Sequence, residues 1–467
     1  MKDLTHGRPI ALILSFALPV LLGNLFQQAY NLADIVIIGQ NLGNDSIAAV
    51  GSVTPVVSLL FSMINGLVTG FAVVAAKNFG AEKYDEMRRT IARMMVFSGV
   101  LTLIIIIGVA VFIEPLLHAL DTSETLFGEA RDYLFIVTLG LAATLVYNFE
   151  ASVLRAVGDS VVPLIILMIS TGLNIGLDLL LVAVFKLGVT GAAMATVAAQ
   201  AISAVVCLAY LFKRRRFLIV KRGDFVFTSE STKELLGAGV GMALMYSVVD
   251  IGSVVLQNGI NGFPDDGIVA AHTAARKIFG LMIMPCSSVC ATLVTYCSQN
   301  LGAGSVTRIK KGIKDGLCIM YVWAVMAILI VFLFGNFFCS LIIADADTET
   351  GSRIVDTAVL YLKWNVPFFL TLVILLGLRS SLQGLGRSVP PIICSVIELT
   401  WKIVTVVVMV PLFGGKNGSP GGSIEEVGGY FGIILSEPII WTSCALFIGI
   451  VAAVELKRLG DKIQNNE

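Results

Sequence analysis

Acidic side chains inside long apolar stretches are the first candidates for chemistry in this sequence. Asp34 and Asp178 both stand in such stretches. A charge that is removed from water costs several kcal/mol unless it is paired or neutralised. Each of these two carboxylates is therefore a candidate for binding a proton or a cation.

The neighbouring polar residues predict that the two carboxylates share one site. Asn174 precedes Asp178 by one helical turn and lies on the same face, and Thr196 stands at a matching depth in the next apolar run. Carboxylate, amide and hydroxyl oxygens suit a hard cation such as Na⁺. Two close carboxylates can instead share a proton, because their charges repel each other. The remaining alternative is a buried polar network that only fixes helix packing.

Three further patterns bear on this site. Gln27 and Asn31 extend a polar stripe along the first apolar run toward Asp34. Gly172 and Gly176 predict that another helix packs closely against the run that contains them. Tyr30 and one face of a later run are expected to line a substrate cavity with adaptable surface. That face consists of Met242, Met245, Tyr246 and Asp250.

The two halves of the chain differ in the charges they place inside apolar runs. Away from the ends of its predicted spans, the first half has three acids, of which Glu150 is the third, and no base. The second half has both signs, and Glu398 and Lys402 are one helical turn apart. We therefore expect internal ion pairs in the second half. Their candidate members are Asp250, Arg276, Lys277, Lys363, Arg379, Glu398, Lys402 and Glu437.

The composition shows what kind of element must position these residues. Of 467 residues, 57% are hydrophobic and only 14% are charged, whereas soluble domains carry about 25% charged residues. Lys and Arg number 32 and balance 32 Asp and Glu, which leaves no basic excess for nucleic acid. The sequence excludes a soluble enzyme, a disordered regulator and a nucleic-acid-binding protein, and it predicts a polytopic membrane protein.

The apolar runs are long enough for twelve membrane-spanning helices, since one span needs about 20 apolar residues. Most of the Lys and Arg residues gather at the two termini and in the even-numbered loops. This asymmetry predicts that both termini are cytoplasmic. The predicted spans are 10–38, 53–76, 91–117, 131–155, 161–185, 189–212, 233–260, 268–297, 315–343, 354–382, 389–413 and 428–456.

The chain also contains an internal duplication. LRAVGDSVVP (154–163) aligns with LQGLGRSVPP (382–391), and KNFGA (77–81) aligns with QNLGA (299–303). Six helices return the chain to the same side of the membrane, so the two halves are parallel repeats. We expect an N-lobe of residues 1–222 that carries the coupling site and a C-lobe of residues 223–467, with a substrate path between the repeats.

Taken together, these segments resemble the multidrug and toxic compound extrusion (MATE) family, in its prokaryotic DinF-like branch. Further matching pieces are LPVLLGNLFQQAYNLADIVIIGQ (18–40), NIGLD (174–178) and GVTGAAMAT (188–196). The resemblance implies an all-α, twelve-helix fold in two six-helix pseudo-repeats. It also implies a cation or proton site at Asp34, Asn174, Asp178 and Thr196, and a kink in the first helix at Pro19. Asp250 and Glu150 depart from the pattern expected for this branch.

The resemblance implies a secondary antiporter of the plasma membrane, not an enzyme. It would export small amphipathic or drug-like molecules in exchange for inward Na⁺ or H⁺, as a monomer surrounded by lipid. No other cofactor and no nucleic acid are expected. A lipid-linked precursor flippase of the same superfamily is one alternative, although it should line its cavity with Arg or Lys. An integral membrane transferase is the other, although the three histidines are scattered along the chain.

Overall fold

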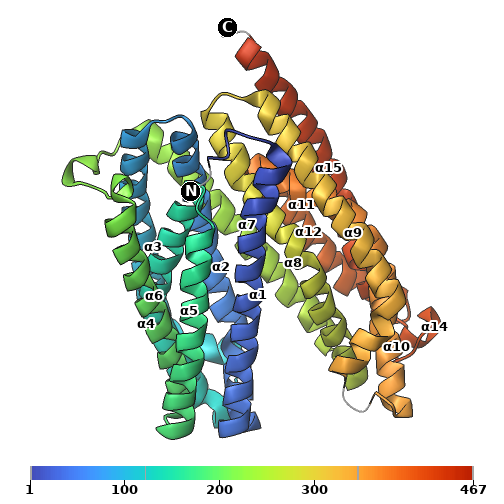
Figure 1. The fold of residues 1–467 in the computed structure, drawn as a ribbon. Coiled ribbons are helices and arrows are strands. Elements are labelled where there is room, and N and C mark those ends of the chain that lie inside the picture. Colours follow the sequence, from blue (N-terminus) through green and yellow to red (C-terminus); the bar gives the residue numbers. More distant parts are fainter. Residues whose placement is uncertain (1–2, 121, 344–345, 465–467) are drawn as a thin grey trace. The chain divides into compact units, whose positions relative to one another are not determined.

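The computed structural model describes residues 3–120, 122–343 and 346–464, and it is built from helices throughout these ranges (Figure 1). Twelve helical segments in these ranges are long and apolar enough to cross a membrane, which confirms the predicted number of spans. Their bounds are Pro9–Leu42, Asp45–Gly80, Tyr84–His118, Glu124–Ala156, Val161–Val184, Gly188–Arg214, Ser229–Asn261, Asp266–Gly302, Val306–Ile342, Glu349–Gly384, Val389–Leu412 and Tyr430–Asp461.

Some spans consist of more than one element. α5 (Val161–Asp178) continues through the π-helical turn η1 (Leu179–Val184), and α12 (Val389–Val404) continues through the π-helical turn η5 (Thr405–Met409). α10 (Glu349–Asn365) and α11 (Phe369–Gly384) are joined by the short 3₁₀ turn η4 (Val366–Phe368). The other spans are the single helices α1 (Pro9–Leu42), α2 (Asn44–Gly80), α3 (Tyr84–Ala119), α4 (Glu124–Ala156), α6 (Gly188–Arg214), α7 (Ser229–Asn261), α8 (Asp266–Gly302), α9 (Val306–Ile342) and α15 (Tyr430–Gln464).

The ends of the helices reproduce the duplication in the backbone. After α4, Gly158 has φ 81°, and the Asp159 N–H donates to the Leu154 carbonyl at 2.9 Å. After α11, Gly386 has φ 72°, and the Arg387 N–H donates to the Leu382 carbonyl, also at 2.9 Å. Both are Schellman caps, which need a left-handed residue that glycine supplies without strain. The two repeated LRAVGDS and LQGLGRS motifs therefore encode one turn used twice.

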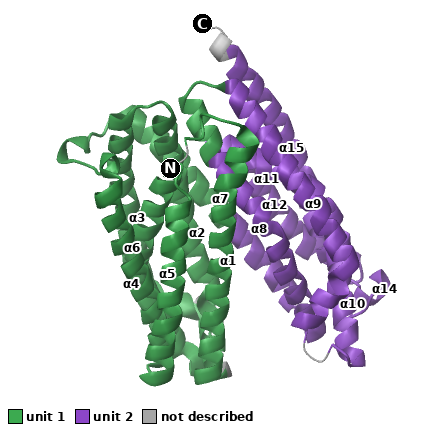
Figure 2. Ribbon diagram, viewed as in Figure 1, with its two compact units in different colours: residues 1–247, 295–305 green, residues 248–294, 306–467 purple. Residues whose placement is uncertain are grey.

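Clustering of contacts divides the chain into two compact units (Figure 2). The first unit consists of residues 1–247 and 295–305, and the second consists of residues 248–294 and 306–467. α7 and α8 each contribute to both units. The predicted lobes, 1–222 and 223–467, follow the repeats rather than these contacts, and they stay a prediction.

Within the first unit, the other repeated motif forms a close helix crossing. A Cβ built on Gly80 of α2 would lie 1.9 Å from the Gln299 carbonyl oxygen of α8. A Cβ built on Gly302 would lie 1.9 Å from the Lys77 carbonyl oxygen of α2. Since KNFGA and QNLGA align, each motif places its glycine against the first residue of the other, and only glycine allows this approach.

The close approach predicted at Gly172 and Gly176 is wrong. A Cβ at either position would meet nothing within 4 Å. Both glycines lie on an outward face of α5, whereas the face that packs against α1 and α6 carries Ser170, Asn174 and Asp178. Small residues alone did not reveal which face of the helix was packed.

Candidate functional site

The four residues of the predicted coupling site come from three neighbouring helices of the first unit, α1, α5 and α6 (Figure 1). Asp34 lies on α1, Asn174 and Asp178 lie on α5, and Thr196 lies on α6. The Asn174 Nδ2 amide donates to Thr196 Oγ1 at 3.5 Å. The carboxyl groups of Asp34 and Asp178 are close enough to interact electrostatically. The structure therefore brings all four side chains to one place.

Two tyrosines complete this cluster. The Tyr30 hydroxyl lies 3.2 Å from Thr196 Oγ1, so this predicted cavity residue contacts a member of the cluster. Tyr133 of α4 lies within electrostatic reach of Asp34, Tyr30 and Asp178. The sequence analysis missed Tyr133, although its depth in the fourth span could have indicated it.

The polar atoms of the cluster are buried, but several lack partners among the described residues. Asp178 is 0% exposed and Asn174 is 1% exposed. Both Asp178 carboxylate oxygens, Asp34 Oδ1 and Asn174 Oδ1 accept no hydrogen bond from the described residues. Within the same residues, neither carboxylate forms an ion pair with Lys, Arg or His. An unpaired buried carboxylate is costly, so this arrangement has room for an additional positive charge.

An apolar group closes one side of the cluster. It lies about one helical turn beyond the polar residues on each of α1, η1 and α6. Its buried members are Ile37, Ile38, Val182 and Ala192. On the other side along α1, the predicted stripe residues Gln27 and Asn31 are exposed. The site is therefore dry at one end and polar at the other.

No described group of three or more His, Cys, Asp or Glu residues has the arrangement of a metal site. The cluster instead combines two carboxylates with amide and hydroxyl oxygens. This donor set suits a monovalent hard cation or a proton better than a transition metal, which prefers imidazole or thiolate ligands.

Two of the internal ion pairs expected in the second unit form among the described residues. Lys402 Nζ lies 2.7 Å from Glu398 Oε1, and both side chains are buried, at 4% and 14% exposure. Arg276 of α8 pairs with Glu437 of α15 at 3.2 Å. Lys363 is exposed in the structure.

The other predicted site residues occupy different surroundings. α1 remains helical through Pro19, so the proposed kink stays a prediction. Met242 and Met245 of α7 are buried, and a Cβ on Gly66 of α2 would lie 2.8 Å from the Met242 carbonyl oxygen. Tyr246 and Asp250 are partly exposed. Their role in a substrate cavity stays a prediction as well.

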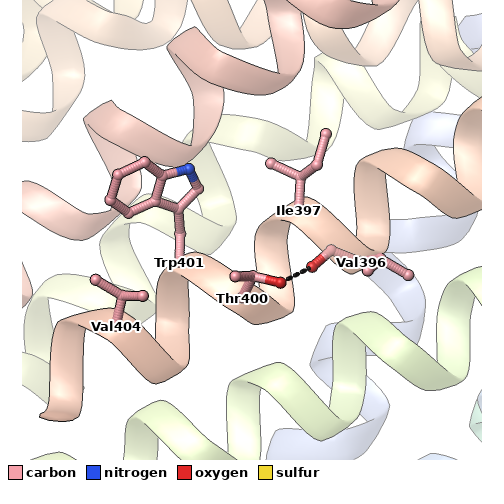
Figure 3. A pocket seen from close by; sticks show the side chains of 5 residues that line it. All are labelled: Val396, Ile397, Thr400, Trp401 and Val404. Carbon is pink, nitrogen blue, oxygen red and sulfur yellow. Dashed lines mark hydrogen bonds between the residues drawn. The ribbon is translucent and has the colours of Figure 1, made fainter.

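An apolar hollow of about 410 Å³ lies on the second unit (Figure 3). All of its lining residues belong to α12, and Thr400 turns its hydroxyl to the Val396 carbonyl at 2.8 Å. This hydrogen bond leaves an apolar surface with one indole. The lining residues are Val396, Ile397, Thr400, Trp401 and Val404.

Comparison with known proteins assigns this fold and its duplication to a family. The family model for MatE matches residues 19–180 and 241–408, one segment from each repeat. The chain belongs to the MatE family. The resemblance to multidrug and toxic compound extrusion transporters is thus confirmed. The alternative of a membrane transferase is wrong, because this is a family of transporters and not of enzymes.

Individual relatives match the MatE chain over most of its length. Probable multidrug resistance protein YpnP of Bacillus subtilis (strain 168) is 25% identical over 453 residues, 96% of either chain. Multidrug export protein MepA of Staphylococcus aureus (strain MSSA476) is 24% identical and covers 86% of this chain and 87% of its own. The crystal structure of MATE in complex with MaL6 has a TM-score of 0.87 at 21% identity, over 99% of this chain and 100% of that chain. The last comparison shows a common fold.

Proposed function

We propose that this protein is a secondary antiporter that exports small amphipathic or drug-like molecules in exchange for inward Na⁺ or H⁺. Asp34 and Asp178 would form the coupling site, assisted by Asn174, Thr196 and Tyr30. The names of YpnP and MepA, a multidrug resistance protein and a multidrug export protein, support export of such molecules. Among the described residues, no Lys or Arg forms an ion pair with Asp34 or Asp178, which argues against a flippase site at these two carboxylates.

The observation that carries this proposal is a pair of carboxylates, Asp178 buried and Asp34 half-buried, that form no ion pair with Lys, Arg or His among the described residues. Asp178 is fully buried and its two oxygens accept no hydrogen bond from the described residues. Removing a carboxylate from water costs several kcal/mol unless its charge is compensated. A charge that arrives from solution, Na⁺ or H⁺, would supply the compensation. An ion that binds and leaves in this way is what a coupling site requires.

Each neighbouring residue has a part under either ion. For Na⁺, Asn174 Oδ1 is available as a neutral ligand because its amide nitrogen is turned toward Thr196. For H⁺, the nearby charge of one carboxylate would favour protonation of the other, and the two would titrate as a pair. The hydroxyl groups of Tyr30 and Thr196 would then orient the shared group by hydrogen bonds.

Coupling also requires that the ion favours one conformation over another, because a ligand shifts an equilibrium only through differential affinity. Asp34 and Asp178 join α1 to α5, so the bound charge would hold these two helices together. With the charge gone, repulsion between the carboxylates would favour their separation. Pro19 leaves α1 without one backbone hydrogen bond in its first half, which would allow the helix to bend there.

The remaining parts of the proposal concern the cellular setting. The distribution of Lys and Arg supports a plasma-membrane protein with both termini in the cytoplasm. We propose that it functions as a monomer, with residues 1–222 and 223–467 as its two lobes. A cysteine at Arg215 should then be protected from impermeant thiol reagents in intact cells, and a cysteine at Asp347 should be labelled.

The test is transport in proteoliposomes with Na⁺ and pH gradients imposed separately. Asp34→Asn and Asp178→Asn keep the side-chain volume and remove the charge, so both variants should fold and both should lose gradient-driven export. Glu150→Gln is the matched control, since Glu150 is another buried acid of the same unit and lies outside the cluster. A folded Asp178→Asn protein that still exports against a gradient would overturn the assignment.

A further inference from the structure

A polar cavity of about 110 Å³ lies in the first unit, among α1, α4 and the start of α5. It is separate from the carboxylate cluster, being near the opposite end of α1 and α5. Its wall is partly polar and partly apolar, and among the described residues that line it Arg155 carries the one full charge. Its lining residues include Pro19, Asn24, Gln27, Asn148, Arg155 and Ser160.

The Arg155 guanidinium has more N–H donors than the hydrogen bonds it makes to the protein. Nη2 donates to Ser152 Oγ at 2.9 Å. Among the described residues, no carboxylate forms an ion pair with Arg155, whereas neighbouring Arg215 is paired. A guanidinium offers five N–H donors in a planar fork that matches a carboxylate. The remaining donors of Arg155 are therefore available at the wall of the cavity.

Asp159, four residues after Arg155, is already paired. Asp159 accepts a hydrogen bond from Arg215 Nη2 at 2.8 Å with one oxygen, and its other oxygen accepts from the Val162 N–H at 3.3 Å. Glu150 stands five residues before Arg155 and interacts with Cys207 of α6, and it forms no ion pair with Arg155 among the described residues. The start of α5 adds the partial positive charge of a helix N-terminus beside Ser160. The cavity therefore has an unbalanced positive wall.

The volume limits what the cavity could hold. Pockets for drug-sized molecules measure about 300–1,000 Å³, so about 110 Å³ is too small for one. It is large enough for a few water molecules or for one small anionic group. We propose that this cavity binds a single carboxylate group through Arg155, with the amides of Asn24, Gln27 and Asn148 and the Ser160 hydroxyl as further donors.

The carboxylate could belong to a free small acid or to one end of an exported molecule. The second source rests on the proposed export function, but binding in the cavity does not. Because Pro19 lines the same cavity, a bound group would touch α1 at the position where the helix lacks a hydrogen bond. Occupancy would therefore be sensed by the helix that also carries Asp34.

The second repeat supplies the control. At the position of Arg155 it has Gln383, and at the position of Asp159 it has Arg387, which pairs with Glu455 at 2.9 Å. The substitution Arg155→Gln therefore installs a residue that the same Schellman turn already accepts elsewhere in the chain. Arg155→Lys keeps a cation in the last turn of α4, where it is favoured by the helix dipole, but removes the fork. Arg387→Gln removes an arginine from the equivalent turn of the other unit.

Binding is tested by hydrogen exchange of the full-length protein in phosphatidylcholine nanodiscs, with sodium acetate as the probe. Sodium gluconate at the same Na⁺ concentration is the reference, since gluconate exceeds the cavity. Acetate should slow exchange in peptides covering 17–28 and 155–168. Arg155→Gln should raise the half-saturating acetate concentration at least about tenfold, and Arg155→Lys by less. Arg387→Gln should respond as the unaltered protein does.

Several results would overturn the proposal. One is equal exchange in acetate and gluconate, and another is an unaltered acetate response in Arg155→Gln. A response only to inorganic phosphate, or only to nanodiscs containing phosphatidylglycerol, would assign the cavity to a phosphate group or a lipid headgroup instead.

The two sources of a carboxylate are distinguished by export of rhodamine B and of its ethyl ester. If the cargo supplies the carboxylate, Arg155→Gln should raise KM for the acid and not for the ester. If a free acid supplies it, Arg155→Gln should change KM equally little for both dyes, while acetate still slows exchange in the unaltered protein. Failure of the coupling assignment would appear as export by Asp178→Asn, and it would leave the acetate response unchanged.

Discussion

The fifth span and its repeat, the eleventh, differ in the charged residues that they contain. In the alignment of the repeated motifs, Asn174 of α5 corresponds to Lys402 of α12, and Asp178 corresponds to Val406. Lys402 is buried against Glu398, so the second unit carries its own counter-charge. The first unit buries Asp178 without one among the described residues. The duplicated span is thus a closed ion pair in one unit and an open acidic site in the other.

The backbone did not diverge in the same way. Both spans begin after a Schellman cap at a left-handed glycine, and both pass into a π-helical turn near their far end. π-helical turns are often found at functional sites, yet only one of these two turns follows an unpaired acid. The two repeats therefore share the shape of this span and differ in its side chains, with an ion pair in one and an acid without an ion-pair partner among the described residues in the other.

The largest effect is expected when the lysine of the second repeat is introduced at the equivalent position of the first repeat. Asn174→Lys puts an ammonium one turn before Asp178, where it can pair with that carboxylate at four-residue spacing, in the reverse order to Glu398 and Lys402. A permanent internal cation would compete with Na⁺ or H⁺, so gradient-driven export should fall to the level of empty liposomes. The protein should remain folded, because the buried carboxylate gains a partner.

Asn174→Ser is the control for this experiment, since it shortens the side chain without adding charge. It should retain measurable export, with a weaker dependence on the coupling ion. Export by Asn174→Lys at the rate of the unaltered protein would break the comparison, because an ion site that tolerates a fixed cation is not the coupling site.

The second prediction concerns the ion pair between Glu398 and Lys402. Lys402→Met leaves Glu398 buried without its cation, which should reduce the free energy of unfolding by about 3–5 kcal/mol. Adding Glu398→Leu should recover most of this loss, because an apolar pair of similar volume replaces the ion pair. Thermal unfolding followed by tryptophan fluorescence would measure both. Two additive losses would show that the residues act separately.

The third prediction concerns the crossing of α2 and α8, where the repeats contact each other within the first unit. Gly80→Ala and Gly302→Ala each place a methyl group where a carbonyl oxygen lies, so each should cost about 1–3 kcal/mol of stability. Gly172→Ala is the matched control, because its Cβ would meet nothing within 4 Å. It should be neutral or slightly stabilising, since alanine favours the helix. Equal losses at Gly80 and Gly172 would contradict this packing.

Much of this architecture could be predicted from the sequence. Apolar length determines the number of spans, and a four-residue spacing placed Asn174 with Asp178 and Glu398 with Lys402. Depth along antiparallel helices was enough to bring Thr196 to the same level. Each of these inferences depends on helix geometry alone, which the chain cannot easily violate inside a membrane.

Contacts that depend on the rotation of a helix could not be predicted in this way. Gly172 and Gly176 suggested a packed face, but the packed face of α5 is the polar one. Depth in the fourth span was the one signal for Tyr133, and Arg155 had none, because a single aromatic residue or arginine near a span end is common in membrane helices. Their roles depend on which neighbour each side chain meets across a helix interface.

The smallest effect is expected from neutralising a buried acid that has no cation to lose. Glu150 is 2% exposed, and its Oε2 atom accepts no hydrogen bond from the described residues. Glu150→Gln keeps the shape of the side chain, so the free energy of unfolding should change by less than about 1 kcal/mol, in either direction.

Glu437→Gln is its counterpart in the second unit, where it removes the partner of Arg276. The Arg276 side chain is 41% exposed and can reach water, so this loss should be only about 1 kcal/mol. Glu437→Gln should therefore unfold at a lower temperature than Glu150→Gln, by a few degrees at most. The reverse order would mean that Glu150 is charged and paired in the native protein, and the distinction between an open first unit and a closed second unit would no longer hold for every buried acid.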